Sequence, residues 1–148
     1  MNLKNKFGKS FILSLCLTLA TGMIFTSCSK DDPLPTVNVE VLTAAPWNFV
    51  SAAPSGTVND ALLKTAYDAA YADATFTFNA DGTVVYSSSG ITIGTGTWSL
   101  TTDKTGLILT IPNTLLNNTT VTVSTLSASS FIFVAPEVIG KTTYTFSV

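Results

Sequence analysis

The sequence predicts an all-β fold, an antiparallel meander of about eight short strands with a single amphipathic helix near its start. From Ala74 onward, apolar and polar residues alternate with a period of two, in short runs rich in Val, Ile, Thr and aromatic residues. Gly, Pro, Asn, Asp and Ser separate these runs at regular intervals, which favours tight turns and either a barrel or a sandwich. The final run alternates like a half-buried strand, so it can close against the first strand and remove both sheet edges.

The first strand is expected to begin at Trp47, and the helix is expected to follow it at about residues 58–72. Residues 57–60 (TVND) have the form of a capping box, with Asp in place of the preferred Glu. Beyond them, apolar residues recur with helical period on one face: Leu63, Ala66, Tyr67, Ala70, Tyr71 and Ala74. The opposite face is expected to be solvated, and it carries Asp60, Lys64 and Asp68, of which the last two are spaced to pair.

The remaining strands follow in order, each bounded by turn residues. Runs 75–78 and 83–88 flank an Asn-Ala-Asp-Gly turn and therefore predict a hairpin. The next run, 91–100, contains Gly94 and Gly96, which indicate a bulge or a sharp bend. The last strands are expected at 107–111, 119–126, 130–135 and 142–148.

The composition of the chain excludes several classes of function. There is no His, and all basic residues are Lys; beyond residue 27, four lysines face nine carboxylates, a net charge of −5. Because a basic surface is missing, nucleic acid is not an expected partner. Because the chain has no His, it has no Ser–His pair. Both cysteines, Cys16 and Cys28, precede the β-rich body, so this body offers no thiol nucleophile and no thiolate metal site. We therefore expect a protein that is not an enzyme and that uses no metal and no cofactor.

The first 27 residues predict a cleaved signal peptide. A basic segment with Lys4, Lys6 and Lys9 precedes the apolar run 10–25, whose 16 residues fall short of the roughly 20 that span a bilayer. An uncleaved N-terminal anchor helix is the alternative. The residues Phe25-Thr26-Ser27-Cys28 resemble a bacterial lipobox, although Phe25 stands where Leu is usual. This resemblance implies cleavage before Cys28 and a diacylglycerol on its thiol, hence attachment to a membrane.

The segment 28–41 is expected to be the lipidated N-terminus and a tether. Ser29, Lys30, Asp31 and Asp32 resemble the surface-export signal of lipoproteins in one lineage of Gram-negative bacteria; the alternative is a merely solvated linker. The resemblance implies an outer-membrane protein exposed at the cell surface. Pro33 and Pro35 favour extended backbone after this signal. The valines at positions 37, 39 and 41 then alternate with polar residues, as in a short edge strand or the beginning of the domain.

Residues 42–148 resemble the lipocalin-like domains of small secreted lipoproteins of Gram-negative bacteria. The resemblance is carried by Pro46-Trp47, by the hairpin 75–83, by Gly-Thr-Trp at 96–98 with the strand after it, and by strands near Val121 and Phe131. Pro46 departs from the Gly that is frequent before this Trp. The resemblance implies a closed eight-stranded barrel but carries over no functional residue.

A barrel of this size either fills with side chains or holds one small ligand. The candidate ligand-lining residues are aromatic: Phe76, Phe78, Tyr86, Trp98, Phe133 and Phe146. The alternative, favoured by the shortness of the strands, is that these residues are the core itself. We expect a lipid-anchored, non-enzymatic protein that binds a small apolar ligand; the alternative is a structural or protein-interaction module of an outer-membrane assembly. A cavity of a few hundred Å³ would distinguish the first from the second.

Overall fold

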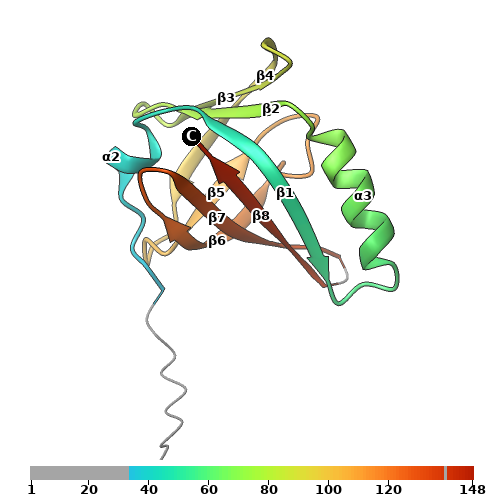
Figure 1. Cartoon of the computed structure of the whole chain (residues 1–148). Coiled ribbons are helices and arrows are strands. Elements are labelled where there is room, and N and C mark those ends of the chain that lie inside the picture. The colour runs from blue at the N-terminus through green and yellow to red at the C-terminus, as the bar shows by residue number, and fades with distance from the viewer. Residues whose placement is uncertain (1–33, 139) are drawn as a thin grey trace, which may run out of the picture. The chain divides into compact units, whose positions relative to one another are not determined.

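A computed structural model describes residues 34–138 and 140–148; the predicted signal peptide, Cys28 and the segment Ser29 to Asp32 lie outside this part of the chain. Eight strands form a closed barrel in which each strand pairs with its neighbours in the chain, and the last pairs with the first. All of these pairings are antiparallel. The predicted meander with barrel closure is confirmed (Figure 1).

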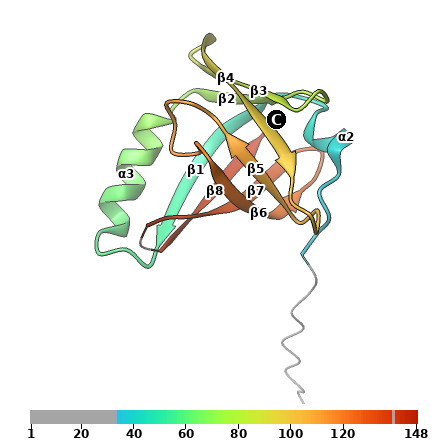
Figure 2. The same cartoon turned by 180° about the vertical axis from the view of Figure 1, so that it is seen from behind.

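The strands are β1 (Trp47–Ser55), β2 (Ala74–Phe78), β3 (Thr83–Ser88), β4 (Ile91–Leu100), β5 (Gly106–Thr110), β6 (Thr119–Leu126), β7 (Ser130–Pro136) and β8 (Lys141–Ser147). The helices are α2 (Val39–Leu42) and α3 (Asp60–Ala70), and they lie on opposite sides of the barrel (Figures 1 and 2). The bulge that two glycines of β4 indicated is present, since the register shifts between the pairs Tyr86–Gly94 and Ser87–Thr92. No helix within the described residues is long and apolar enough to cross a membrane.

Helix α2 stands where the alternation of valines suggested a short strand or the beginning of the domain. The side chain of Asn38 decides the matter, because its Oδ1 accepts hydrogen bonds from the N–H groups of Glu40 and Val41 (3.0 and 3.4 Å) and so caps a helix. Leu42 is fully buried, and its carbonyl accepts a hydrogen bond from the Trp47 indole (2.8 Å). Val37 is also buried, so packing against the barrel begins before residue 42.

The weakest junction of the barrel lies between β1 and β2. These strands pair only at Trp47 and Asn48, whereas β1 pairs with β8 along almost its whole length. Beyond Asn48, helix α3 packs against β1 (Figure 2). There the Ala52 N–H, which has no strand partner on this side, donates to Asp68 Oδ1 (2.9 Å). Pro54, which cannot donate, is tolerated in β1 because no strand pairs with it on that side.

Helix α3 lies within the predicted range and is shorter by two residues at each end. The predicted capping box forms only in part: the Thr57 N–H donates to Asp60 Oδ1 (2.9 Å) and the Thr57 hydroxyl donates to the same oxygen. The N-cap residue is Asn59, whose side chain makes no capping hydrogen bond. Lys64 and Asp68 form the expected ion pair. The placement of Asp68 on a wholly solvated face was wrong, since its carboxylate also accepts the N–H of Ala52. Lys64 and this N–H together lower the pKa of Asp68.

The barrel interior is filled with aromatic side chains. The ring of Phe146 lies 5.4 Å from Phe76, 5.4 Å from Phe133 and 5.7 Å from Phe131, measured between ring centroids. All four residues are at most 2% exposed. Each such burial stabilises the fold by about 1.5–3 kcal/mol, and close ring pairs add about 0.5–1.5 kcal/mol. The interior is therefore a packed core.

Candidate ligand-binding site

The two ends of the barrel differ in how they are covered. We call the end where β2 and β4 finish and where α2 packs the α2 end, and the end where β1 and β3 finish the α3 end. At the α3 end the chain passes from β1 through α3 to β2, and the β5–β6 and β7–β8 loops also lie there. Two pockets lined by described residues open at this end, one near the beginning of the helix and one near its end.

The four tyrosines of the chain gather at the α3 end. Tyr67 and Tyr71 are four residues apart and share one face of the helix, Tyr86 comes from β3, and Tyr144 comes from β8. Ring centroids of Tyr71 lie 6.3 Å from Tyr86 and 6.2 Å from Tyr144, and those of Tyr67 and Tyr144 are 6.3 Å apart. The Tyr71 hydroxyl accepts the N–H of Leu115 (3.2 Å), which ties α3 to the β5–β6 loop. The tyrosines thus connect α3, two strands and a loop.

Two buried hydroxyl groups at this end lack a hydrogen-bond partner among the described residues: Thr142 Oγ1 and the Tyr144 hydroxyl. Thr142 is fully buried and Tyr144 is 1% exposed. An unpartnered buried polar group costs about 1–3 kcal/mol, and such groups are rare in folded proteins. Neither hydroxyl lines a pocket; they lie behind Tyr67, which interacts with Thr142 and lines one pocket, and Tyr71, whose ring packs on Tyr144 and lines the other.

Burial and neighbouring groups raise the pKa of Tyr67, Tyr71 and Tyr144. Burial raises the pKa of Tyr71 and Tyr144 above the usual value of about 10, and nearby phenols and the Glu137 carboxylate raise it further. The pKa of Tyr67 is raised by burial first and then by Glu137. At neutral pH these groups therefore offer O–H donors and lone-pair acceptors, not negative charge.

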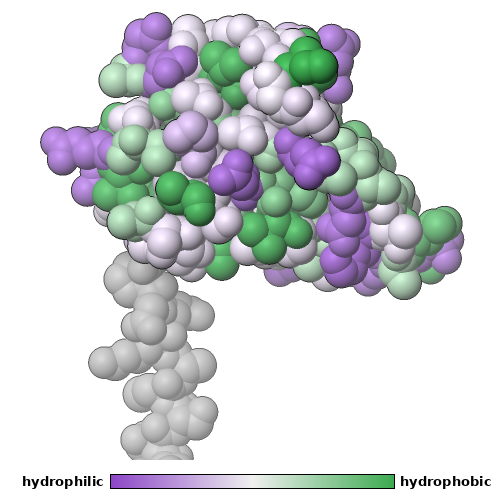
Figure 3. Space-filling model, turned by 45° about the horizontal axis from the view of Figure 1, so that its top comes forward, coloured by the Kyte–Doolittle hydropathy of each residue, from purple (hydrophilic) through white to green (hydrophobic). Residues whose placement is uncertain are grey.

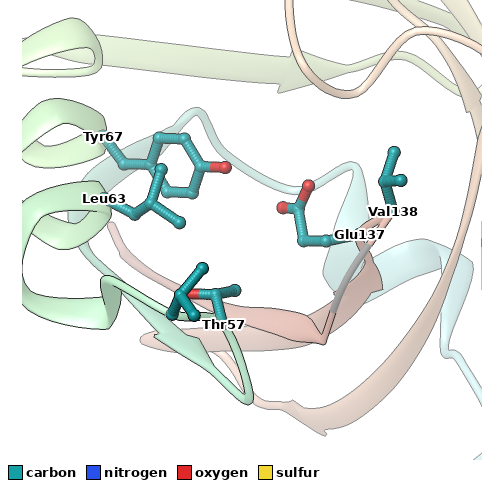
Figure 4. A pocket seen from close by; sticks show the side chains of 6 residues that line it. Thr57, Leu63, Tyr67, Glu137 and Val138 are labelled. Carbon is teal, nitrogen blue, oxygen red and sulfur yellow. The ribbon is translucent and has the colours of Figure 1, made fainter.

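The first pocket, which we call the Glu137 pocket, has a volume of about 280 Å³. It lies between the beginning of α3 and the β7–β8 loop, with Tyr67 and Glu137 facing each other across it (Figure 4). Its described lining is Thr57, Val58, Leu63, Tyr67, Glu137 and Val138.

The second pocket, which we call the Asn113 pocket, has a volume of about 330 Å³. It lies between the end of α3, strand β3 and the β5–β6 loop. Its described lining is Ala70, Tyr71, Tyr86, Asn113, Thr114 and Leu115. Both pockets approach the size of small-ligand sites, which are typically about 300–1,000 Å³.

The six aromatic residues that the sequence predicted as possible ligand-lining residues do not all lie at a pocket. Tyr86 lines the Asn113 pocket. The other five line neither pocket and are buried against one another in the barrel: Phe76, Phe78, Trp98, Phe133 and Phe146. This placement agrees with the alternative expectation, that these aromatic residues form the core of the barrel. The pockets lie under and beside α3 and not in the lumen.

Sequence reasoning did not single out Tyr67, Tyr71, Glu137, Thr142 or Tyr144 as site residues. A signal was present for three of them, because Tyr67 and Tyr71 share a helix face and Tyr144 alternates inward along the last strand. No sequence pattern brings Glu137 to the helix. Among the residues that the structure describes, no group of three or more His, Cys, Asp or Glu side chains could hold a metal ion.

A family model and a solved structure are similar to this chain. Residues 44–133 match the family model described as the lipocalin-like domain. No curated protein matches the chain. A solved structure of a DUF4847 family protein from Bacteroides vulgatus has a similar fold, with a TM-score of 0.52 and 18% sequence identity. The match covers 74% of this chain and 96% of the other, and at this identity it shows a shared fold alone.

Proposed function

The chain belongs to the lipocalin-like domain family, and from this premise we propose that it is a non-enzymatic protein that binds a small ligand at the α3 end. Proteins with this domain are generally binding proteins. The observation that carries the proposal is the pair of buried, unpartnered hydroxyls of Thr142 and Tyr144. A ligand with a polar group that reaches them would satisfy both, and the tyrosine rings would cover its apolar part.

The test is native mass spectrometry of the protein purified from its own membranes. We expect a co-purified small molecule on the wild type and its loss from the double variant Thr142→Val, Tyr144→Phe. The matched control is Thr143→Val, because Thr143 is the neighbour on β8 and is not buried. An identical spectrum for the wild type and the double variant would refute the proposed site.

We further propose that a lipid on Cys28 holds the protein on a bacterial outer membrane. The support is the apolar leader and the Thr-Ser-Cys sequence at its end. The described chain joins the barrel at the α2 end, where the Val37 N–H bonds the Lys104 carbonyl (2.8 Å). The described residues therefore begin at the end opposite to the two pockets. Cys28→Ala should release the protein from washed membranes, and continued sedimentation with them would refute lipidation.

Surface exposure is the next step of the same proposal, and it rests on Ser29, Lys30, Asp31 and Asp32. Replacement of Lys30, Asp31 and Asp32 by Ala should protect the protein from protease added to intact cells while it stays membrane-bound. Cleavage at the wild-type rate would mean that these residues do not direct export.

Docking of a partner protein is the alternative function, and exposed apolar residues at the α3 end favour it. Val58, Leu62 and Val138 are 92%, 68% and 103% exposed. On the face that Figure 3 shows, however, hydrophobic residues lie as separate spots among polar ones, whereas docking surfaces are usually contiguous. Crosslinking in intact membranes through Leu62→Cys separates the two, because only docking predicts a protein adduct.

A further inference from the structure

The Glu137 pocket combines apolar walls with one charged group. Val58, Leu63 and Val138 supply aliphatic surface, Thr57 and Tyr67 supply hydroxyl groups, and Glu137 is the one charged residue of the described lining. The pocket is open to solvent, since Val58 and Val138 are 92% and 103% exposed, and a carboxylate there attracts a cation at close range. The chemistry of this pocket is therefore decided by what meets Glu137.

The described lysines do not compensate Glu137. Lys64 pairs with Asp68 on the helix, in the one ion pair found among the described residues. Lys104 lies at the α2 end, where its carbonyl bonds Val37. Lys141 precedes Thr142 on β8 and is exposed, while Thr142 points inward, so Lys141 points away from the barrel. No described lysine neutralises Glu137, and the group that its carboxylate meets across the pocket is the neutral Tyr67 hydroxyl.

The position of Glu137 is fixed by the backbone. Its N–H donates to the Gly140 carbonyl (3.2 Å), which closes the β7–β8 loop on itself. Gly140 has φ +86°, and a Cβ on it would lie 2.3 Å from the Ser55 carbonyl oxygen, so this loop packs tightly against the end of β1. The main chain of Glu137 is therefore fixed at the edge of the pocket, which reduces the entropic cost of binding there.

Tyr67 completes the site from the other side. Its hydroxyl is directed at the Glu137 carboxylate across the pocket (Figure 4). Its ring belongs to the same lining and can face a cation, since the negative face of a phenol ring attracts positive charge. The Glu137 charge also raises the pKa of Tyr67, Tyr71 and Tyr144, so its field reaches these three side chains.

We infer that the Glu137 pocket takes a small organic cation, an ammonium group on a compact apolar body. The ammonium group meets the Glu137 carboxylate and the Tyr67 ring, and the apolar body lies against Val58, Leu63 and Val138. This inference rests on the proposed function and adds the charge of the ligand to it. An anion would be repelled by Glu137, and a neutral ligand would leave the carboxylate without a cation.

The test compares three probes of the same shape and different charge on the full-length protein. These are 2-phenylethylamine (cationic), 2-phenylethanol (neutral) and 3-phenylpropionate (anionic), with affinities measured by calorimetry at low ionic strength. We expect the amine to bind about fivefold or more tighter than the alcohol, as a partly exposed ion pair allows, and the anion to bind least. Added salt should reduce the difference between amine and alcohol.

Glu137→Gln should abolish the preference for the amine while the alcohol binds as before. The matched control is Glu40→Gln, which removes an exposed carboxylate at the α2 end and should leave the preference unchanged. If Glu137→Gln fails to fold, the salt dependence of amine and alcohol binding to the wild type tests the same ion pair. Equal binding of amine and alcohol, or a preference that survives Glu137→Gln or high salt, overturns the inference.

Failure of this inference and failure of the proposed function are distinguishable. If the alcohol binds as well as the amine, the cation is wrong and ligand binding at the α3 end stands. If no probe binds to any variant, the inference is overturned, and the co-purified molecule sought by mass spectrometry decides the proposed function independently.

Discussion

The two ends of this short β-barrel are closed in different ways, and they differ in whether their buried polar groups form hydrogen bonds. At the α2 end, the indole N–H groups of Trp47 and Trp98 bond the carbonyls of Leu42 and Asn79 (2.8 and 3.0 Å). At the α3 end, the hydroxyls of Thr142 and Tyr144 are buried without a partner. Satisfied polar groups stabilise a fold, and unsatisfied ones detract from it. The difference agrees with the proposed division, in which the α2 end stabilises the fold and the α3 end binds the ligand.

The residue types follow the same division. Helix α2 contributes the fully buried Leu42, whereas α3 contains no buried residue and covers β1 only partly. The α3 end is lined instead by tyrosines, which have an apolar ring and a polar tip and suit a surface that meets a ligand. The following variants should make this difference larger or remove it.

Trp47→Ala should have the largest effect, because Trp47 is 1% exposed and holds α2 in place. We expect a loss of about 3–5 kcal/mol in the free energy of unfolding, measured with urea. Trp47→Phe keeps one aromatic ring but removes the indole N–H and part of the ring volume, so it should cost less, about 1–3 kcal/mol. A loss below 1 kcal/mol for the Ala variant would contradict the role of the α2 end.

Gly140→Ala should come next, since its Cβ would lie 2.3 Å from the Ser55 carbonyl oxygen at a φ of +86°. The strain should cost about 1–3 kcal/mol and displace Glu137, so that the preference for 2-phenylethylamine also falls. Gly90→Ala is the control, because its φ is +77° and no atom lies within 4 Å of the added Cβ. The control should cost about 1–2 kcal/mol and leave amine binding unchanged. Equal effects of both variants on binding would mean that the Gly140 contact does not position Glu137.

Removal of the Asp68 carboxylate should loosen α3 without unfolding the barrel. Asp68→Ala deprives the Ala52 N–H of its acceptor, and we expect a cost of about 0.5–1.5 kcal/mol together with faster hydrogen exchange at Ala52. Lys64→Ala removes only an exposed ion pair and should cost less than about 0.5 kcal/mol. If Lys64→Ala accelerated exchange at Ala52 as much as Asp68→Ala, the hydrogen bond to β1 would not be what holds the helix.

High pH should act on the α3 end before the α2 end. The folded protein raises the pKa of Tyr67, Tyr71 and Tyr144 above the unfolded value of about 10, so it favours their neutral forms. The stability that this gives is present below about pH 10 and is lost as the pH rises above it. Tyrosinate absorbance during an alkaline titration should rise together with the loss of α3 packing. Stability that is constant from neutral pH to about pH 11 would contradict the burial of these phenols.

The barrel could be predicted from the sequence because its signals are local. The alternation along each strand and the Asp81-Gly82 turn are set by neighbouring residues. The capping box of α3 is local as well, and its contact between the Thr57 N–H and Asp60 is present, although Asn59 is the N-cap. Helix α2 was harder, because alternating valines suit a strand and only the side chain of Asn38 shifts the balance to a helix.

The pockets could not be predicted because they depend on contacts between distant parts of the chain. Tyr67 and Glu137 meet across one pocket only after β7, β8 and α3 have packed. The unpaired Thr142 hydroxyl could not be foreseen either, since a threonine in a strand usually reaches solvent or a neighbour. The aromatic residues of the strands were visible in the sequence, but whether they line a lumen or fill it depends on the packed volume.

The central claim is that the Tyr144 hydroxyl serves ligand binding and does not stabilise the fold. Unfolding of Tyr144→Phe in urea tests this claim most directly. The protein is first stripped of bound molecules by denaturation and refolding. Because this hydroxyl has no partner among the described residues, we predict a free energy of unfolding equal to that of the wild type or up to about 1 kcal/mol higher. A loss of more than about 1 kcal/mol would contradict the account, because it would show that the hydroxyl stabilises the empty barrel.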